Sequence, residues 1–289
     1  SVTIVCGRSA ATLFSAVPGL ERVIILDKML LSMHWVYLWL NCIGHFWDIL
    51  VDLRNAPLTY ILPAKKTYRL FRSRRPEHRV QTLGHVLKIG NSSPSPHVWV
   101  AERHRKDAAR LVPSGAPILA VGPTANWRGK QWRADRFIQL IQRLTSSEGI
   151  LCNAYVIIFG REDERPTALK VIDSIPADRC IDLVGRVDLL TAFACLERSS
   201  FYVGNDSGLM HLAAASGVPT LGLFGPSPEA CYAPWGSKCV AIRGPLPFDK
   251  IFPKNFDHRS TDTLMDGLSV SAVEQEATKL WKNVYKDLL

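Results

Sequence analysis

A regular alternation of strands and helices over residues 118–224 constrains the fold more than any other feature of this sequence. Five largely apolar segments are predicted strands: Ile118–Val121, Tyr155–Phe159, Cys180–Val184, Phe201–Gly204 and Thr220–Phe224. The segments between them have the spacing of helices, as Phe137, Leu140, Ile141 and Leu144 show. Apolar strands that alternate with helices predict an α/β fold whose parallel sheet is covered on both faces. Such sheets bind ligands outside the carboxyl ends of their strands, so the loops there are the first candidates for function.

The first part of the chain has a weaker pattern of the same kind. Its predicted strands are Val2–Cys6, Val23–Leu26 and Ile49–Leu53. Between the last two strands, Leu31, Trp35, Leu38 and Cys42 have helical spacing and predict a mostly buried amphipathic helix.

Two features predict the division of the chain. The Pro113–Pro117 cluster is the predicted linker between a first domain, residues 1–112, and a second domain, residues 113–268. Residues 269–289 are predicted to form a C-terminal helix, with a capping box at Ser271-x-x-Glu274.

Composition excludes several classes of protein. With 47% apolar and 21% charged residues among 289, the chain can bury a core, which excludes disordered and low-complexity proteins. Its seven cysteines form no CxxC pair and no His/Cys cluster with zinc spacing, so we expect no metal site and a reducing, cytoplasmic compartment. No charged and then apolar segment precedes the first strand, so we expect no signal peptide.

The most apolar segment, Met29–Val51, is the only candidate for a membrane span. It contains His34, Asn41, His45 and Asp48, which a spanning helix would hold at considerable cost. We therefore expect no transmembrane helix, and the tryptophans of this segment leave a role at the membrane interface open.

The positive charge lies in the first part of the chain. Residues 1–110 have 16 Lys and Arg against 7 Asp and Glu, a net charge of +9, whereas residues 111–289 have 19 of each. The densest part is the basic cluster, which comprises Lys65, Lys66, Arg69, Arg72, Arg74, Arg75 and Arg79. A one-sided charge favours one particular anionic partner over general affinity for nucleic acid. A solvated loop is the alternative interpretation of the cluster.

The loop after the strand Phe201–Gly204 is the strongest local signal for a ligand site. Asp206 or Ser207 is placed to cap the next helix, and Gly208 in its first turn lets a ligand approach the backbone. The free N–H groups of that turn predict a phosphate site. His211 lies one turn beyond Ser207 on the same face. An ordinary capped helix with a core histidine is the alternative, and Asp206 suits a cap better than a phosphate ligand.

Two further loops lie at the same predicted edge of the sheet. Gly122–Trp132 offers Asn126 and Lys130, and a diphosphate needs a cation there. Gly160–Glu164 offers carboxylates that could accept hydrogen bonds from ribose hydroxyls, although acidic helix starts are common. The three loops together predict a nucleotide pocket. The chain has no GxGxxG and no Walker motif, which argues against an oxidoreductase.

These residues also resemble a known family. The stretch DSGLMHLAAASGVPTLGLFGPSP at residues 206–228, with Pro234-Trp235-Gly236 soon after, resembles the signature of glycosyltransferase family 9, the bacterial lipopolysaccharide heptosyltransferases and their relatives. The resemblance extends to the Gly122–Trp132 loop, to Gly160–Glu164 and to Trp47–Arg54, and covers nearly the whole chain.

The resemblance implies a GT-B architecture, in which two Rossmann-like domains face each other across a cleft. The basic first domain would bind a lipopolysaccharide-type acceptor, and the second would bind a nucleotide sugar, with ADP the expected nucleotide. In that site the nucleotide-binding residues would be Asn126, Lys130, Glu164, Asp206, Ser207, Gly208 and His211, with Lys130 stabilising the leaving group. Family members invert the anomeric carbon, generally without metal and without a separate cofactor. The terminal helix would pack back on the first domain.

The chain departs from the family pattern at its start. Family members begin with a strand and a turn containing Gly-Asp, whose Asp is the general base, and residues 1–30 contain no such turn. We therefore expect an incomplete first domain and a base upstream of Ser1. The leading hypothesis is a sugar transferase at the cytoplasmic face of the inner membrane. A catalytically silent nucleotide-sugar-binding module is the second hypothesis, and a nucleic-acid-binding or other anion-binding protein is the third.

Overall fold

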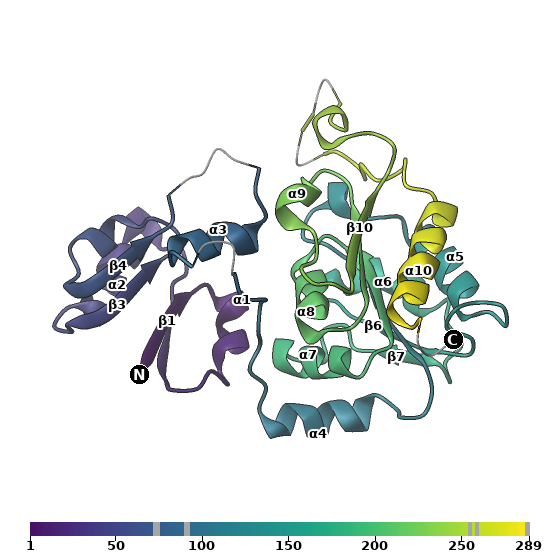
Figure 1. Cartoon of the computed structure of the whole chain (residues 1–289), viewed down its shortest axis with the longest axis horizontal. Coiled ribbons are helices and arrows are strands. Elements are labelled where there is room, and N and C mark those ends of the chain that lie inside the picture. Colours follow the sequence, from purple (N-terminus) through teal and green to yellow (C-terminus); the bar gives the residue numbers. More distant parts are fainter. Residues whose placement is uncertain (72–75, 90–92, 254–255, 258–259, 287–289) are drawn as a thin grey trace. The chain divides into compact units, whose positions relative to one another are not determined.

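A computed structural model describes residues 1–71, 76–89, 93–253, 256–257 and 260–286. The chain forms two compact units, Ser1–Trp99 and Val100–Leu289, each of which is described by itself (Figure 1). The predicted boundary at residue 112 is wrong because α4 (Glu102–Leu111) packs against α7 (Leu189–Glu197) of the second unit. Ala108 and Val112 are fully buried, so the Pro113–Pro117 cluster is a loop inside that unit.

The second unit is built on one six-stranded parallel sheet in the order β10-β9-β8-β5-β6-β7. Its strands are β5 (Ile118–Gly122), β6 (Tyr155–Ile158), β7 (Cys180–Asp182), β8 (Phe201–Asn205), β9 (Thr220–Phe224) and β10 (Cys239–Arg243). The five predicted strands are confirmed, and β10 is an additional edge strand. Every residue of β5, β8 and β9 is buried, as their apolar sequences require.

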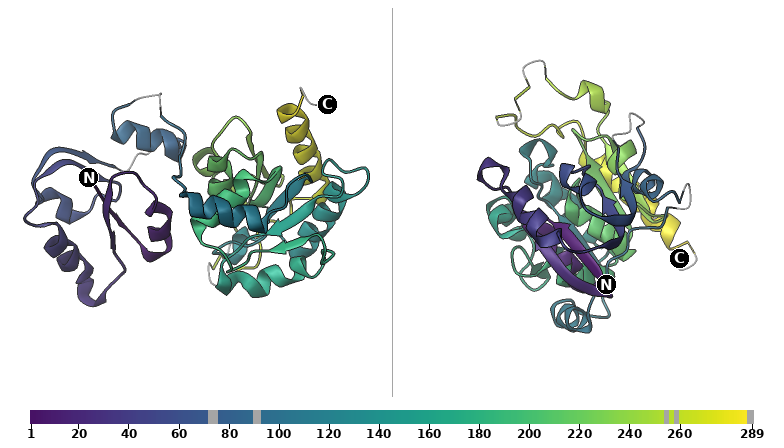
Figure 2. Two further views of the ribbon diagram at one scale, coloured as in Figure 1. Left: turned by 90° about the horizontal axis from the view of Figure 1, so that it is seen from below. Right: turned by 90° about the vertical axis from the view of Figure 1, so that its left-hand side faces the viewer.

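Helices cover both faces of this sheet (Figures 1 and 2). On one face α5 packs against α6 and α10, and on the other α7 packs against α8. The bounds are α5 (Ala134–Thr145), α6 (Arg165–Ile172), α8 (Gly208–Ser216), α9 (Glu229–Tyr232) and α10 (Val270–Val284). The main core joins the sheet to α5, α6 and α10, and Phe137 and Leu140 of α5 lie in it with no exposed area.

The C-terminal helix differs from its prediction in two ways. The apolar face of this helix, with Val273, Ala277 and Leu280, is buried in the core of the second unit. The expectation that the helix packs on the first domain is therefore wrong for this face. The helix also begins earlier, because the Ser269 side chain accepts a hydrogen bond from the backbone N–H of Ala272. Ser271 lies inside the helix, and the predicted capping box does not form.

The first unit contains two separate two-stranded parallel sheets, β1-β2 and β3-β4. Its elements are β1 (Val2–Cys6), β2 (Leu20–Ile25), β3 (Trp47–Asp52), β4 (Ala64–Arg69), α1 (Arg8–Ala11), α2 (His34–Cys42) and α3 (Arg79–Val86). A small core of Ile24, Leu38, Cys42 and Leu58 holds α2 by its inner face. The predicted strands are confirmed, and the predicted helix is confirmed in part. Leu38 and Cys42 are its buried residues, but Leu31 lies before α2 with a positive φ of 51° and is 88% exposed, so the expectation of a mostly buried helix is wrong. Lys65, Lys66 and Arg69, for which a solvated loop was the alternative interpretation, lie in the strand β4.

The longest helices of both units are too short or too polar to cross a bilayer. Over the parts of the chain that the structure describes, no helix meets the requirements of a membrane span.

Candidate functional site

All strands of the sheet are parallel, but the order in which successive strands are added reverses between β5 and β8, and the candidate site lies where these two strands end. Gly122, the last residue of β5, is paired with Gly204 of β8. In sequence order the sheet places its strands as 3-2-1-4-5-6, and the crevice at such a reversal is where open α/β sheets bind ligands. The loops that follow β5 and β8 are therefore neighbours, as their positions in the sequence predict.

Asn205 joins these two loops. Its side chain has no exposed area, and its Nδ2 donates to the carbonyl oxygen of Pro123 at 2.8 Å. Its Oδ1 accepts from the backbone N–H of Trp132 at 3.0 Å. The sequence analysis did not select Asn205, although a lone amide at the end of an apolar strand is a signal of a buried polar contact.

Lys130 and Asp206 form the central ion pair of the site. Lys130 ends a short 3₁₀ helix, Arg128–Lys130, and its Nζ donates to Oδ2 of Asp206 at 2.7 Å. The lysine side chain is 25% exposed and the aspartate side chain 7%, so the pair is largely shielded from water while part of the lysine side chain stays accessible. Asp206 is therefore not the cap of α8. It orients Lys130, which is a role that the sequence analysis did not assign.

The N-terminus of α8 lies directly beyond this pair. Ser207 is the N-cap residue and has an extended backbone, with φ −150° and ψ 170°. Gly208 is exposed, and so is His211 one turn later. The first backbone N–H groups of a helix have no partner within it, and they carry partial positive charge. The arrangement of an ammonium group beside a helix N-terminus suits a phosphate or diphosphate.

Glu164 connects the loop after β6 to the loop after β5. Its Oε2 accepts from the Thr124 hydroxyl at 2.9 Å and from the backbone N–H of Arg161 at 2.9 Å. The glutamate ends a 3₁₀ helix, Glu162–Glu164, and its side chain is 15% exposed. The structure thus places Glu164 at the predicted edge of the sheet and adds Thr124 as its partner. Asn126 is exposed in the loop after β5.

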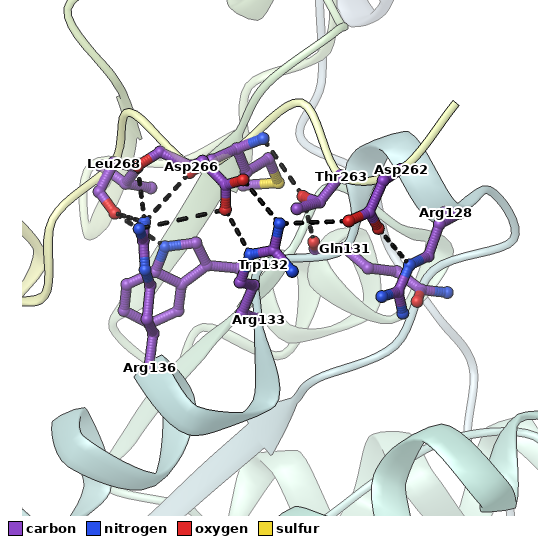
Figure 3. A network of polar contacts seen from close by, with 10 residues as sticks. Arg128, Gln131, Trp132, Arg133, Arg136, Asp262, Thr263, Asp266 and Leu268 are labelled. Atoms are coloured by element: carbon purple, nitrogen blue, oxygen red, sulfur yellow. Dashed lines mark hydrogen bonds and ion pairs between the residues drawn. The ribbon is translucent and has the colours of Figure 1, made fainter. Parts of the chain in front are cut away.

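A network of arginine and aspartate residues fastens the loop that carries Lys130 (Figure 3). Arg128 and Arg133 both contact Asp262, at 2.8 and 3.1 Å, and Arg133 also binds Asp266 at 2.5 Å. The Arg128 guanidinium, by its hydrogen bond, lowers the pKa of Asp262 to about 2. The backbone N–H of Leu264 donates to the carbonyl of Gly129 at 3.0 Å. Residues 262–268 therefore hold the loop in place although they lie far from it in sequence; Arg128 and Asp262, for example, are 134 positions apart.

The basic cluster belongs to the first unit. Lys65 pairs with Asp48 at 2.5 Å, and Arg69 Nη2 donates to the carbonyl of Thr59 at 2.7 Å. Lys66 is exposed on β4, and Arg79 begins α3. Arg72, Arg74 and Arg75 lie outside the described residues.

Metal ligands are absent from the described part of the site. Across residues 1–71, 76–89, 93–253, 256–257 and 260–286, no three His, Cys, Asp or Glu side chains gather in a way that could hold a metal ion.

Comparison with known proteins decides the family. Residues 77–255 match glycosyltransferase family 9 (heptosyltransferase), which is more than half of the chain. The chain belongs to glycosyltransferase family 9. The match includes the loops after β5, β6 and β8, and it confirms the resemblance read from residues 206–228.

Curated relatives are heptosyltransferases. Lipooligosaccharide heptosyltransferase 2 of Haemophilus influenzae is 28% identical over 155 residues, which are 52% of this chain and 42% of that protein. Lipopolysaccharide heptosyltransferase 2 of Salmonella typhimurium is 26% identical over 168 residues, which are 55% of this chain and 47% of that one. The matched part thus spans slightly less than half the length of these relatives.

Solved structures are similar along nearly the whole chain. A family 9 glycosyltransferase from Veillonella parvula has a TM-score of 0.79 at 18% identity, with 97% of this chain and 88% of that chain covered. The ADP-heptose lipopolysaccharide heptosyltransferase II of Escherichia coli has a TM-score of 0.70 at 19% identity, with 98% and 89% covered. At this level of identity the similarity shows a shared fold, and it confirms the predicted α/β fold of the GT-B class.

Proposed function

We propose that this protein transfers a heptose-like sugar from a nucleoside diphosphate sugar, with ADP as the nucleotide, to an acceptor of the lipopolysaccharide-core type. The observation that carries the proposal is the Lys130–Asp206 pair beside the N-terminus of α8, at the carboxyl ends of β5 and β8. Family membership supports the reaction class. Two similar structures of an E. coli heptosyltransferase contain ADP and ADP-2-deoxy-2-fluoro heptose, which supports the choice of nucleotide.

The chemistry that the site must perform is stabilisation of a leaving group. When the bond between C1 of the sugar and the diphosphate oxygen breaks, its electron pair goes to that oxygen. Lys130 has three N–H donors, so it can keep its hydrogen bond to Asp206 and still donate to the diphosphate. The N–H groups at the start of α8 add partial positive charge. Together they would stabilise the developing charge without a metal ion, which is why we propose metal-independent transfer. Inversion at C1 is the part of the proposal that rests on family membership.

The remaining site residues are proposed to bind the rest of the donor. Oε2 of Glu164 accepts from Thr124 and Arg161, whereas Oε1 has only an ion pair with Nε of Arg161 at 3.9 Å, so Oε1 is the atom that we assign to a ribose hydroxyl. Asn126 is exposed in the loop after β5 and His211 is exposed on the first turns of α8, and we assign both to contacts with the donor.

A panel of nucleotides tests the donor site. ADP is expected to raise the melting temperature in the presence of EDTA, because a ligand that binds only the native state stabilises it by mass action. UDP, GDP and CMP are expected to raise it less. If none of the four nucleotides changes the melting temperature, the proposed donor site is wrong. Turnover of an ADP-sugar by the same preparation then distinguishes a transferase from a catalytically silent binding module.

We also propose that the first unit contacts an anionic membrane surface through the apolar segment Met29–Phe46. No Asp, Glu, Lys or Arg lies in this segment, and Leu30, Leu31, Leu40 and Phe46 are between 62% and 88% exposed. Exposed apolar side chains at this density mark a surface that contacts a membrane or a partner. Residues 1–99 have 12 Lys and Arg against 5 Asp and Glu, a net charge of +7, which favours an anionic surface.

A further inference from the structure

The Tyr202 hydroxyl is a buried polar group that the proposed donor site does not explain. Tyr202 lies in β8 with no exposed area, and among the described residues its hydroxyl has no hydrogen-bond partner of good geometry. An unpaired buried hydroxyl costs free energy, and native proteins rarely keep one without a reason.

Glycine residues place this hydroxyl at the reversal point of the sheet. A Cβ on Gly122 would lie 2.2 Å from the Tyr202 oxygen, and a Cβ on Gly204 would lie 2.3 Å from it. Neither glycine has a positive φ, so both positions need glycine for space and not for backbone conformation. The hydroxyl therefore occupies the space that side chains at Gly122 and Gly204 would fill, beside the paired carboxyl ends of β5 and β8.

The space around this hydroxyl borders the start of α8, where Ser207 is the N-cap residue. A Cβ on Gly122, which would meet the hydroxyl, would also lie 3.1 Å from Cδ2 of Leu209 in the first turn of that helix. Tyr202 and Ser207 make no hydrogen bond in this structure. Burial raises the pKa of Tyr202, and interaction with the Ser207 side chain lowers it in part. The phenol thus stays protonated at neutral pH and can donate a hydrogen bond. Ser207 is the N-cap of α8, yet its side chain does not accept from the helix backbone as N-cap serines commonly do. Its hydroxyl is therefore available to other partners.

We propose that Tyr202 is a positioning residue whose hydroxyl donates to Ser207 Oγ when a diphosphate binds at the N-terminus of α8, and so turns the Ser207 O–H toward that diphosphate. This inference rests on the proposed function, because it needs a diphosphate at that place. Each hydrogen bond in such a chain polarises the next, so the serine becomes a better donor to the phosphate oxygen. Tyr202 itself touches no substrate and acts through Ser207.

A double-mutant cycle tests the relay, with ADP affinity measured by titration calorimetry in EDTA. Tyr202→Phe is expected to weaken ADP binding about 3- to 10-fold, the range for one neutral hydrogen bond, and Ser207→Ala by at least as much. In the Ser207→Ala background, Tyr202→Phe is expected to have no further effect. Ser207→Thr keeps a hydroxyl and is expected to restore the dependence on Tyr202. Tyr155→Phe, at the opposite end of the same sheet, is the matched control and should bind ADP as the parent does.

Thermal stability separates the relay from a purely structural role. Tyr202→Phe removes an unpaired buried hydroxyl, so its melting temperature should equal or exceed that of the parent. A variant that loses ADP affinity only in proportion to lost folding would overturn the inference. So would unchanged affinity in Tyr202→Phe, or an equal loss with and without Ser207. If the parent fails to bind ADP, the proposed function fails with the inference; if the parent binds ADP and the cycle shows no coupling, only the inference fails.

Discussion

The two units of this chain are both α/β, but they differ in how completely they bury their strands. In the second unit β5, β8 and β9 are buried along their whole length, and one large core joins the sheet to three helices. In the first unit Ile49 and Val51 of β3 are 58% and 47% exposed, and the described residues show only a small core around Ile24, Leu38, Cys42 and Leu58. The polar candidate site therefore lies on the unit with the larger buried core, whereas the exposed apolar residues and the excess of positive charge lie on the first unit.

The largest expected effect concerns the core of the second unit. Phe137 has no exposed area and packs edge-to-face on Trp132 with ring centroids 5.1 Å apart. Phe137→Ala is expected to lower the free energy of unfolding by about 3–5 kcal/mol, since it removes buried area and leaves a cavity. Leu30→Ala in the first unit should change it by less than about 0.5 kcal/mol. Urea denaturation monitored by circular dichroism measures both free energies of unfolding. Similar losses in the two variants would contradict the difference in burial between the two units.

The next effect concerns the surface of the first unit. Leu30→Asp with Leu31→Asp is expected to weaken binding to phosphatidylglycerol vesicles about 100-fold, because two apolar side chains would no longer enter the interface. Leu169→Asp is the matched control, because Leu169 is an exposed leucine on α6 of the second unit. Sedimentation with vesicles measures both, and binding should fall as salt is added. If the parent and the double variant bind the vesicles equally well, the proposal that the apolar segment contacts the membrane is wrong.

A smaller effect concerns the ion pair of the site. Loss of the Lys130 side chain would leave the carboxylate of Asp206 almost buried and without its ion-pair partner. Lys130→Ala is therefore expected to destabilise the second unit by about 1–3 kcal/mol. Adding Asp206→Ala should recover part of that loss. Lys279→Ala removes an exposed pair with Glu276 and serves as the control. An unchanged melting temperature in Lys130→Ala would contradict the structural role given to the pair.

The smallest effect concerns the pH dependence of the arginine and aspartate network. Hydrogen bonding to Arg128 lowers the pKa of Asp262 from its ordinary value of 3.8 to about 2. The stabilisation is therefore complete above pH 3.8 and is lost as the pH falls through 2. Because the Asp262 side chain is 56% exposed, we expect at most about 0.5 kcal/mol. Melting curves of parent and Asp262→Asn should differ at pH 6 and converge near pH 2, and a constant difference would contradict this assignment.

Local pattern was enough to predict most of the second unit. Its central strands are apolar along their length because both faces are covered, and the helices between them keep a clear apolar stripe. The sequence analysis missed β10 because an edge strand is only half buried and follows a loop rich in Gly and Pro. It missed β4 because Lys65 and Lys66 face solvent and break the apolar pattern.

The site was predicted as a set of residues but not as a set of contacts. Lys130 and Asp206 were both selected, yet their ion pair joins positions 76 apart, which no local pattern reveals. The contacts from Arg128 and Arg133 to Asp262 and Asp266 bridge still longer separations. Tyr202 was read as an ordinary apolar position of a strand, and its buried hydroxyl became visible only beside Gly122 and Gly204.

The most direct test of the central claim compares the affinities of ADP and AMP by calorimetry in EDTA. In the proposed donor site the β-phosphate lies between Lys130 and the N-terminus of α8, so the parent should bind ADP more tightly than AMP by about 1.5–3 kcal/mol. Lys130→Ala should lose most of that difference while AMP affinity stays near the parent value. Equal affinity of the parent for ADP and AMP, or an undiminished preference for ADP in Lys130→Ala, would contradict the diphosphate site.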